Sequence, residues 1–245
     1  MNLLARLEAN FTGLDSAALL ALLLCWLATG WISEHPPAFR PSVSWLMQTY
    51  RRQWMREFIT RQPRIFDASV IDNLRQGTAF FASTSVIAIG GGVAMISNAA
   101  MLQGLAHDLT IGAETTQIRV KMLVVLAFLA NALLKFIWSN RLFGYCAIMM
   151  AAVPNDVTDP GAEPQAARAA EINITAARSF DRGLHSIYFA LAALVFLIGP
   201  RALILAALIT SGVLLRREFA SQSRAIMLRD RGAPMPRDRS PRRPV

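Results

Sequence analysis

Two polar side chains, Asn131 and Lys135, lie four residues apart inside a long apolar run. Residues at this spacing share one face of an α-helix. An ionisable side chain within a membrane span is a functional candidate, because such groups mark ion or substrate paths. Two interpretations are open: the pair contacts an anion or substrate, or Lys135 extends to the interface near Arg141 or pairs internally with Asn131.

A second grouping, Asp181, His185 and Ser186, contains the residue types of a nucleophile with a general base. The aspartate and the histidine are four residues apart, which is also the spacing of an ordinary pair on a helix surface. The other histidines are scattered, and the two cysteines are far apart and inside apolar runs. We therefore expect no catalytic residues, no metal site and no cofactor.

A stripe of small residues, Thr84, Ala88 and Gly92, follows helical spacing in another apolar run. Small residues let helix backbones approach closely within lipid. The stripe therefore predicts a packing surface for a neighbouring helix. The alternative is that the three glycines at 90–92 interrupt the helix beside a substrate site, as in some transporters.

The elements that would position these residues are long apolar segments. A transmembrane helix needs about 20 mainly apolar residues, and 54% of this chain is hydrophobic and clustered in runs. We predict an all-α fold, a multi-pass helical membrane protein with about five transmembrane helices. The predicted spans are 14–32, 77–100, 122–142, 185–199 and 202–215. Gly199 and Pro200 between the last two runs favour a helical hairpin.

Two further segments, 42–60 and 165–183, are predicted to be amphipathic helices on the cytoplasmic side. The first has an aromatic face and an arginine face, so it either lies in the membrane interface or packs its aromatic face on the bundle. We expect residues 1–222 to form a single helical membrane domain. The basic segment 223–245, rich in proline and arginine, is expected to be disordered.

The charge is strongly positive, with 25 Lys+Arg against 16 Asp+Glu. Segment 36–75 contains seven arginines, segment 141–183 contains four and segment 216–243 contains nine. Five spans put these segments on one side, so the positive-inside rule predicts an outside N-terminus and a cytoplasmic C-terminus. Topology and anionic lipid headgroups account for the arginines. Membrane lipids are the expected partners, and nucleic-acid binding is not required.

Four motifs occur in order along the chain: RQPRIFDASVIDNLRQGTAFFASTSVIAIGG, KFIWSNRLFGYCAIMMAAVP, ARSFDRGLHSIYFALAALVFLIGP and LLRREF. This series resembles the bacterial membrane-protein family called domain of unknown function 599, over residues 15–222. The resemblance implies a multi-pass protein of the bacterial cytoplasmic (inner) membrane. It implies no activity, substrate or cofactor.

The sequence is compatible with three hypotheses about the function of this protein. The first is a non-enzymatic scaffold or accessory subunit in a homo- or hetero-oligomer, favoured by the small-residue stripe and the amphipathic helices. The alternative is a small transporter or channel with an intramembrane polar site at Asn131 and Lys135. A membrane enzyme acting through Asp181, His185 and Ser186 is the third hypothesis.

Overall fold

The computed structural model describes residues 13–37, 39–98, 104 and 115–229, and all regular elements within these ranges are helices. They are α2 (Gly13–Glu34), α3 (Val43–Thr60), α4 (Ile65–Ser97), α6 (Thr115–Ala151), α7 (Ala162–Leu194), the short 3₁₀ helix η1 (Val195–Leu197), α8 (Pro200–Phe219) and α9 (Gln222–Arg229). The predicted all-α class is confirmed.

Four of the described helices are long and apolar enough to cross a membrane: Gly13–Glu34, Ile65–Ser97, Gln117–Ala151 and Ala162–Leu197. The prediction of a multi-pass helical membrane protein is therefore confirmed. At 1.5 Å per residue, α4 and α7 are each about 50 Å long and α6 about 55 Å, against a hydrocarbon thickness of about 30 Å. These three helices must extend well beyond the lipid.

The predicted count of five spans is approximate. The run 202–215 lies within α8, which is not among the four helices long and apolar enough to span. Arg201 and Arg216 bound its apolar part, which at fourteen residues is about 21 Å long. A break at Gly199 and Pro200 separates α8 from α7, and Gly199 has a φ of 156°.

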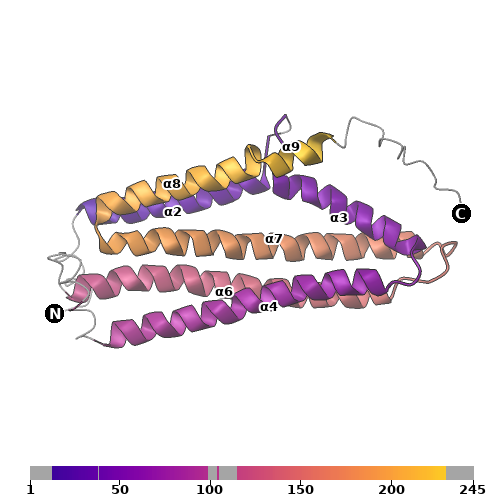
Figure 1. Cartoon of the computed structure of the whole chain (residues 1–245), viewed down its shortest axis with the longest axis horizontal. Coiled ribbons are helices and arrows are strands. Elements are labelled where there is room, and N and C mark those ends of the chain that lie inside the picture. The colour runs from indigo at the N-terminus through magenta and orange to yellow at the C-terminus, as the bar shows by residue number, and fades with distance from the viewer. Residues whose placement is uncertain (1–12, 38, 99–103, 105–114, 230–245) are drawn as a thin grey trace, which may run out of the picture.

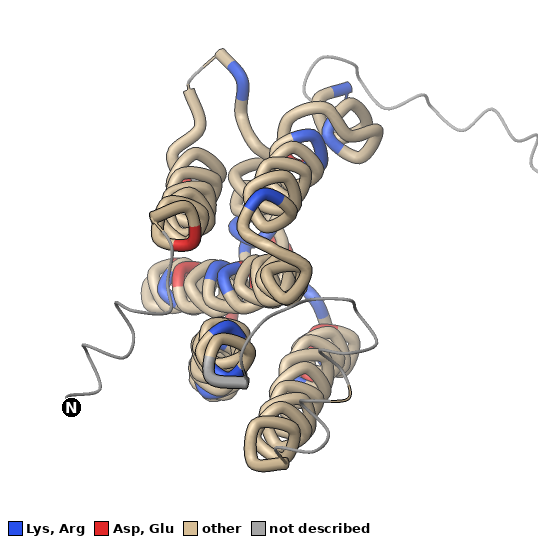
Figure 2. Tube along the Cα trace, turned by 90° about the vertical axis from the view of Figure 1, so that its left-hand side faces the viewer, with Lys and Arg blue, Asp and Glu red and all other residues tan. Residues whose placement is uncertain are grey.

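The long helices pack one beside the next across the bundle. Helix α4 packs on α6, α6 on α7, and α7 on α2 and α8, which lie side by side (Figure 1). A view along the long axis also places α7 between the α2 and α8 pair and the α6 and α4 pair (Figure 2). Helix α3 continues the chain from α2 and lies against α7.

One of the two main cores lies where α2, α6, α7 and α8 meet. Its buried side chains include Leu22, Phe128, Phe189, Phe196 and Leu203. The outer surfaces of the same helices expose leucine, isoleucine and valine, which suits helices surrounded by lipid. We call this part of the bundle the apolar half.

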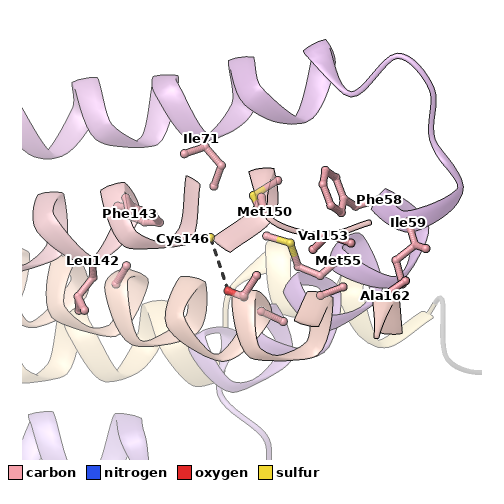
Figure 3. Close-up of a cluster of buried hydrophobic side chains, with 14 residues drawn as sticks. Met55, Phe58, Ile59, Ile71, Leu142, Phe143, Cys146, Met150, Val153 and Ala162 are labelled. Carbon is pink, nitrogen blue, oxygen red and sulfur yellow. Dashed lines mark hydrogen bonds between the residues drawn. The ribbon is translucent and has the colours of Figure 1, made fainter. Parts of the chain in front are cut away.

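The other main core lies at the opposite end of the long helices and packs α3 against α6 and α7 (Figure 3). Its members include Met55, Phe58, Phe143, Cys146 and Met150. We call this part the polar half; it consists of α3 with residues 65–76, 141–151 and 162–183. Arg52 of α3 also donates to Glu171 of α7 at 2.7 Å.

Helix α7 runs through both halves without interruption. The predicted amphipathic helix 165–183 and the first ten residues of the predicted span 185–199 therefore form one element, followed by η1. Gly183 lies where α7 crosses α6, and a Cβ at this position would be 2.5 Å from Cε1 of Phe136. The glycine permits the close approach of these two helices.

The corner between α3 and α4 is held by Arg64, which precedes α4. Its Nη1 donates to the carbonyl of Val153 at 2.8 Å, and its Nη2 donates to Pro154 at 2.9 Å and Ile59 at 3.3 Å. The guanidinium also lies over the ring of Phe58, 4.5 Å from its centroid. One side chain thereby joins the ends of α3 and α6.

Asp67, in the first turn of α4, holds the same corner from the inside. Its side chain is fully buried, and Oδ1 accepts from Trp54 Nε1 at 2.6 Å and from Arg61 Nη1. A carboxylate is favourable near a helix N-terminus, because backbone N–H groups point outward there.

The chain beyond α8 continues into α9 (Gln222–Arg229), so residues 223–229 at the start of the predicted tail are helical. Arg224 Nε donates to the carbonyl of Pro41 at 2.8 Å, which ties α9 to the segment between α2 and α3. The rest of the predicted disordered segment lies outside the described residues. So do the last two residues of the predicted span 77–100.

Candidate functional site

The predicted polar residues Asn131 and Lys135 are not hydrogen-bonded to each other and lie in different environments. Asn131 Nδ2 donates to Ser186 Oγ of α7 at 2.7 Å, and Ser186 in turn donates to the carbonyl of Arg182 at 3.1 Å. Lys135 is half-buried, and it makes no hydrogen bond or ion pair within the described ranges. Asn131 therefore joins α6 to α7 and does not bind Lys135.

Replacing Lys135 by methionine is expected to change the free energy of unfolding by no more than about 0.5 kcal/mol, because no polar contact is lost. Asn131→Leu is the comparison, since it removes one interhelical hydrogen bond worth about 0.6 kcal/mol in a membrane protein. Unfolding of both variants in detergent checks the difference. A larger loss for Lys135→Met would show that the lysine has an essential polar partner.

The predicted small-residue stripe lies only partly at a helix contact. Thr84 and Ala88 are exposed in the single chain, whereas a Cβ on Gly92 would lie 2.6 Å from Cδ2 of Leu126 on α6. The buried positions of α4 are Ile71, Thr78 and Ser85, with the buried Asp67 at its start. With Gly92, these three form a stripe with a seven-residue repeat, which is the pattern of helices that pack at a small angle.

A cavity of about 240 Å³ with charged residues in its wall lies where α2 ends, α3 begins and α8 ends, against the middle of α7. We call it the junction cavity, because it lies between the apolar and polar halves. Val43, Met47, Ile174, Leu184 and Leu214 contribute its main apolar surface. Its charged lining consists of Glu34, Arg51, Arg178, Asp181, Arg182, Arg217 and Glu218.

Several of these charges are bound to other groups in the wall. Arg182 donates from Nε and Nη2 to the two oxygens of Glu34, both at 2.5 Å, in a bidentate pair. Glu218 accepts from the backbone N–H of Ser44 at 3.1 Å and from its hydroxyl at 3.0 Å. Ser44 lies in the first turn of α3, so this carboxylate occupies a position that suits an anion.

Arg51 enters the cavity wall from the core of the polar half. Its Nη1 donates to Oδ1 of Asn173, a fully buried side chain whose Nδ2 lies 3.5 Å from Cys146 Sγ. Burial lowers the pKa of the Arg51 guanidinium below its ordinary value, and the nearby Asp181 carboxylate opposes that shift. A cation held this deeply needs an anion in or beside the cavity.

Two charged groups of the cavity, Arg178 and Asp181, make no hydrogen bond and no ion pair with other described residues. Asp181 is nevertheless surrounded by charge: Arg51 and Arg217 attract it, and Glu218 and Glu34 repel it. Its side chain is exposed in the single chain and lines the cavity. These two groups are therefore available to a ligand.

His185 closes the wall toward the apolar half. Its Nε2 lies 2.8 Å from Thr29 Oγ1 of α2, and that hydroxyl also lies 2.7 Å from the carbonyl of Cys25. His185 thus bonds to α2, and Ser186 bonds to Asn131, so the grouping expected near Asp181 is not assembled for nucleophilic attack.

Among the described residues, no group of three His, Cys, Asp or Glu side chains could hold a metal ion. The cavity lining contributes hydrogen-bonding and charged groups.

A comparison with protein families gives one match. The model described as "Protein of unknown function, DUF599" matches residues 17–223. The chain belongs to the DUF599 family. The predicted resemblance to domain of unknown function 599 is therefore confirmed. Neither the curated proteins nor the solved structures contain a match to this DUF599 chain.

Sequence reasoning missed the junction cavity of this DUF599 protein. Its charged residues come from four separate helices, and Glu34 is 148 residues from its partner Arg182. A signal was present: Arg178 and Asp181 are charges three residues apart on a helix that is about to enter an apolar run. That pattern predicts charged residues at the membrane interface, but it does not predict which residues of α2, α3 and α8 complete the cavity.

Proposed function

We propose that this DUF599 protein is a non-enzymatic multi-pass membrane protein that binds a phosphate-bearing amphiphile, with the headgroup in the junction cavity. The observation that carries the proposal is Arg178, a guanidinium in the cavity wall without a hydrogen-bond or ion-pair partner in the described part of the chain. Arginine presents a planar set of donors that matches phosphate and carboxylate oxygens.

The position of the cavity along the helices suits an amphiphile. Leu184 and Leu214 line it where α7 and α8 lead into the apolar half, whereas Arg51 and Arg178 belong to the polar half. A headgroup among the arginines would leave its hydrocarbon tail beside apolar helices. Arginines at this level attract the anionic lipids of a membrane surface.

The proposal includes an orientation and a location. The arginine-rich segments and the junction cavity would face the cytoplasm, with the N-terminus outside and the C-terminus inside, in the cytoplasmic (inner) membrane of a bacterium. This orientation counts α8, which packs beside α2, as a fifth crossing. The excess of arginine in segments 36–75 and 141–183 and after residue 215 supports this orientation.

Within this proposal the protein is a scaffold or accessory subunit of a homo- or hetero-oligomer. The polar half supports that role, because it forms a second packed core on extensions of the long helices. The transporter alternative would require a polar path at Asn131 and Lys135. Neither residue lines the junction cavity, so the proposal does not use them.

Replacement of Arg178 by glutamine is expected to weaken binding of phosphatidylglycerol to the purified full chain by about fivefold. An arginine near an anionic surface contributes about 1 kcal/mol, and tenfold in affinity corresponds to about 1.4 kcal/mol. Native mass spectrometry with increasing lipid gives the dissociation constant for the first bound molecule.

The matched control is Arg168→Gln, ten residues earlier on α7, where the side chain is exposed and outside the cavity. This variant should bind phosphatidylglycerol like the unmodified protein. Equal binding by all three proteins would overturn the proposed function, because the charge in the cavity would then have no role.

A further inference from the structure

The junction cavity presents a carboxylate and a guanidinium that make no hydrogen bond to other described residues. Arg178 and Asp181 are three residues apart on α7, so they lie on neighbouring parts of one helix face. They do not form an ion pair with each other, and both line the cavity. Each therefore has its hydrogen-bonding capacity open toward the same space.

The other arginines in the wall make contacts of their own, and although Arg51 and Arg217 attract Asp181, neither forms an ion pair with it. Glu34 holds Arg182, Arg217 Nη1 donates to Tyr188 at 3.0 Å, and Arg51 donates to Asn173. A ligand with only negative charge would satisfy Arg178 and meet repulsion from Asp181 nearby. The complementary ligand carries a positive group next to its negative group.

We propose that the junction cavity binds a headgroup in which a phosphate is joined to a primary ammonium, the phosphate at Arg178 and the ammonium at Asp181. This proposal rests on the proposed function and names the class of amphiphile. At about 240 Å³, the cavity is smaller than the roughly 300–1,000 Å³ typical of sites for drug-sized ligands. It suits a headgroup better than a larger polar molecule.

The lining also distinguishes a primary from a quaternary ammonium. A primary ammonium donates three hydrogen bonds, which Asp181 can accept directly. A trimethylated ammonium donates none and is usually recognised by a cage of aromatic rings. In the described lining, Tyr188 is the one aromatic side chain beside the imidazole of His185. The primary ammonium is therefore the better partner.

The first experiment measures headgroup preference in the unmodified full chain. Native mass spectrometry would compare phosphatidylethanolamine, phosphatidylglycerol and phosphatidylcholine with matched acyl chains. We expect the ethanolamine lipid to bind at least about fivefold more tightly than the other two, as one charge contact of about 1 kcal/mol implies. Equal or tighter binding of the choline lipid would overturn the inference.

The second experiment removes the carboxylate. Asp181→Asn should abolish the preference for phosphatidylethanolamine over phosphatidylglycerol and should raise affinity for the latter. The matched control is Glu163→Gln, an exposed carboxylate in the first turn of α7 that does not line the cavity. It should leave the preference intact. A preference that survives in Asp181→Asn would also overturn the inference.

These results separate the inference from the proposed function. Suppose that Arg178→Gln weakens the binding of lipids while Asp181→Asn leaves the preference for phosphatidylethanolamine unchanged. The cavity then binds the lipid phosphate, and Asp181 does not bind the ammonium. If neither variant has an effect, both proposals are wrong. Soluble glycerophosphoethanolamine tests the source: binding as tight as that of the lipid supports a soluble ligand of this chemistry, and weaker binding supports the lipid.

Discussion

Replacing Arg64 by methionine is expected to reduce the free energy of unfolding by about 2–4 kcal/mol. The substitution removes three hydrogen bonds from a charged donor, each worth about 1.5–3 kcal/mol when fully buried. Since the Arg64 side chain is only half-buried, the sum must be discounted for solvent screening. The carbonyls of Ile59, Val153 and Pro154 would then lose their shared donor.

Unfolding of the purified full chain in mild detergent measures this loss. The control is Arg56→Met on α3, an exposed arginine without a hydrogen bond to other described residues. It should remain within about 0.5 kcal/mol of the unmodified protein. Arg64→Lys should resemble Arg64→Met, because a single ammonium cannot reach three carbonyls and stack on Phe58. Equal stability of Arg64→Met and Arg56→Met would show that the corner does not depend on this side chain.

Replacing Gly183 by alanine is expected to destabilise the protein by about 1–3 kcal/mol, the usual cost of overpacking. The new methyl group would lie 2.5–2.9 Å from three atoms of the Phe136 ring. That ring is fully buried, and its centroid lies 5.4 Å from that of Phe81 and 5.5 Å from that of Phe180. A shift of the ring would therefore disturb its packing against these two rings.

A double-mutant cycle identifies the contact responsible. Phe136→Leu removes the ring, so the double variant should lose less stability than the sum of the two single variants. The control is Gly144→Ala on α6, where a Cβ would meet nothing within 4 Å. That change should stabilise the helix by up to about 1 kcal/mol, the difference in helix propensity. Destabilisation by Gly144→Ala equal to that of Gly183→Ala would exclude the contact with Phe136 as the cause.

The fold class could be predicted from the sequence because the apolar runs are long and bounded by arginines. The number of spans could not be predicted as well. The part of α8 between Arg201 and Arg216 is too short for certain assignment by hydropathy, and its position depends on packing against α2. Helix packing along α4 was also difficult to predict, because the stripe through Thr84 and Ala88 is as rich in small residues as the buried one.

The candidate site was harder to predict than the fold. Asn131 and Lys135 were identifiable because polar residues are rare inside apolar runs, but the partner of Asn131, Ser186, is 55 residues away. Arg64 lies in the motif RQPRIFD, and its contacts include the carbonyls of Val153 and Pro154 after α6, about 90 residues later. No local pattern describes these contacts.

The packing of α3 against α7 also sets an order of events during synthesis. Arg52 and Glu171, which join the two helices, are 119 residues apart. At about 5–20 residues per second, the ribosome needs roughly 6–24 s to supply the second after the first. For most of that interval the apolar face of α3, with Met55 and Phe58, lacks its partners from α6 and α7. We expect this face to lie against the membrane surface until those helices are made.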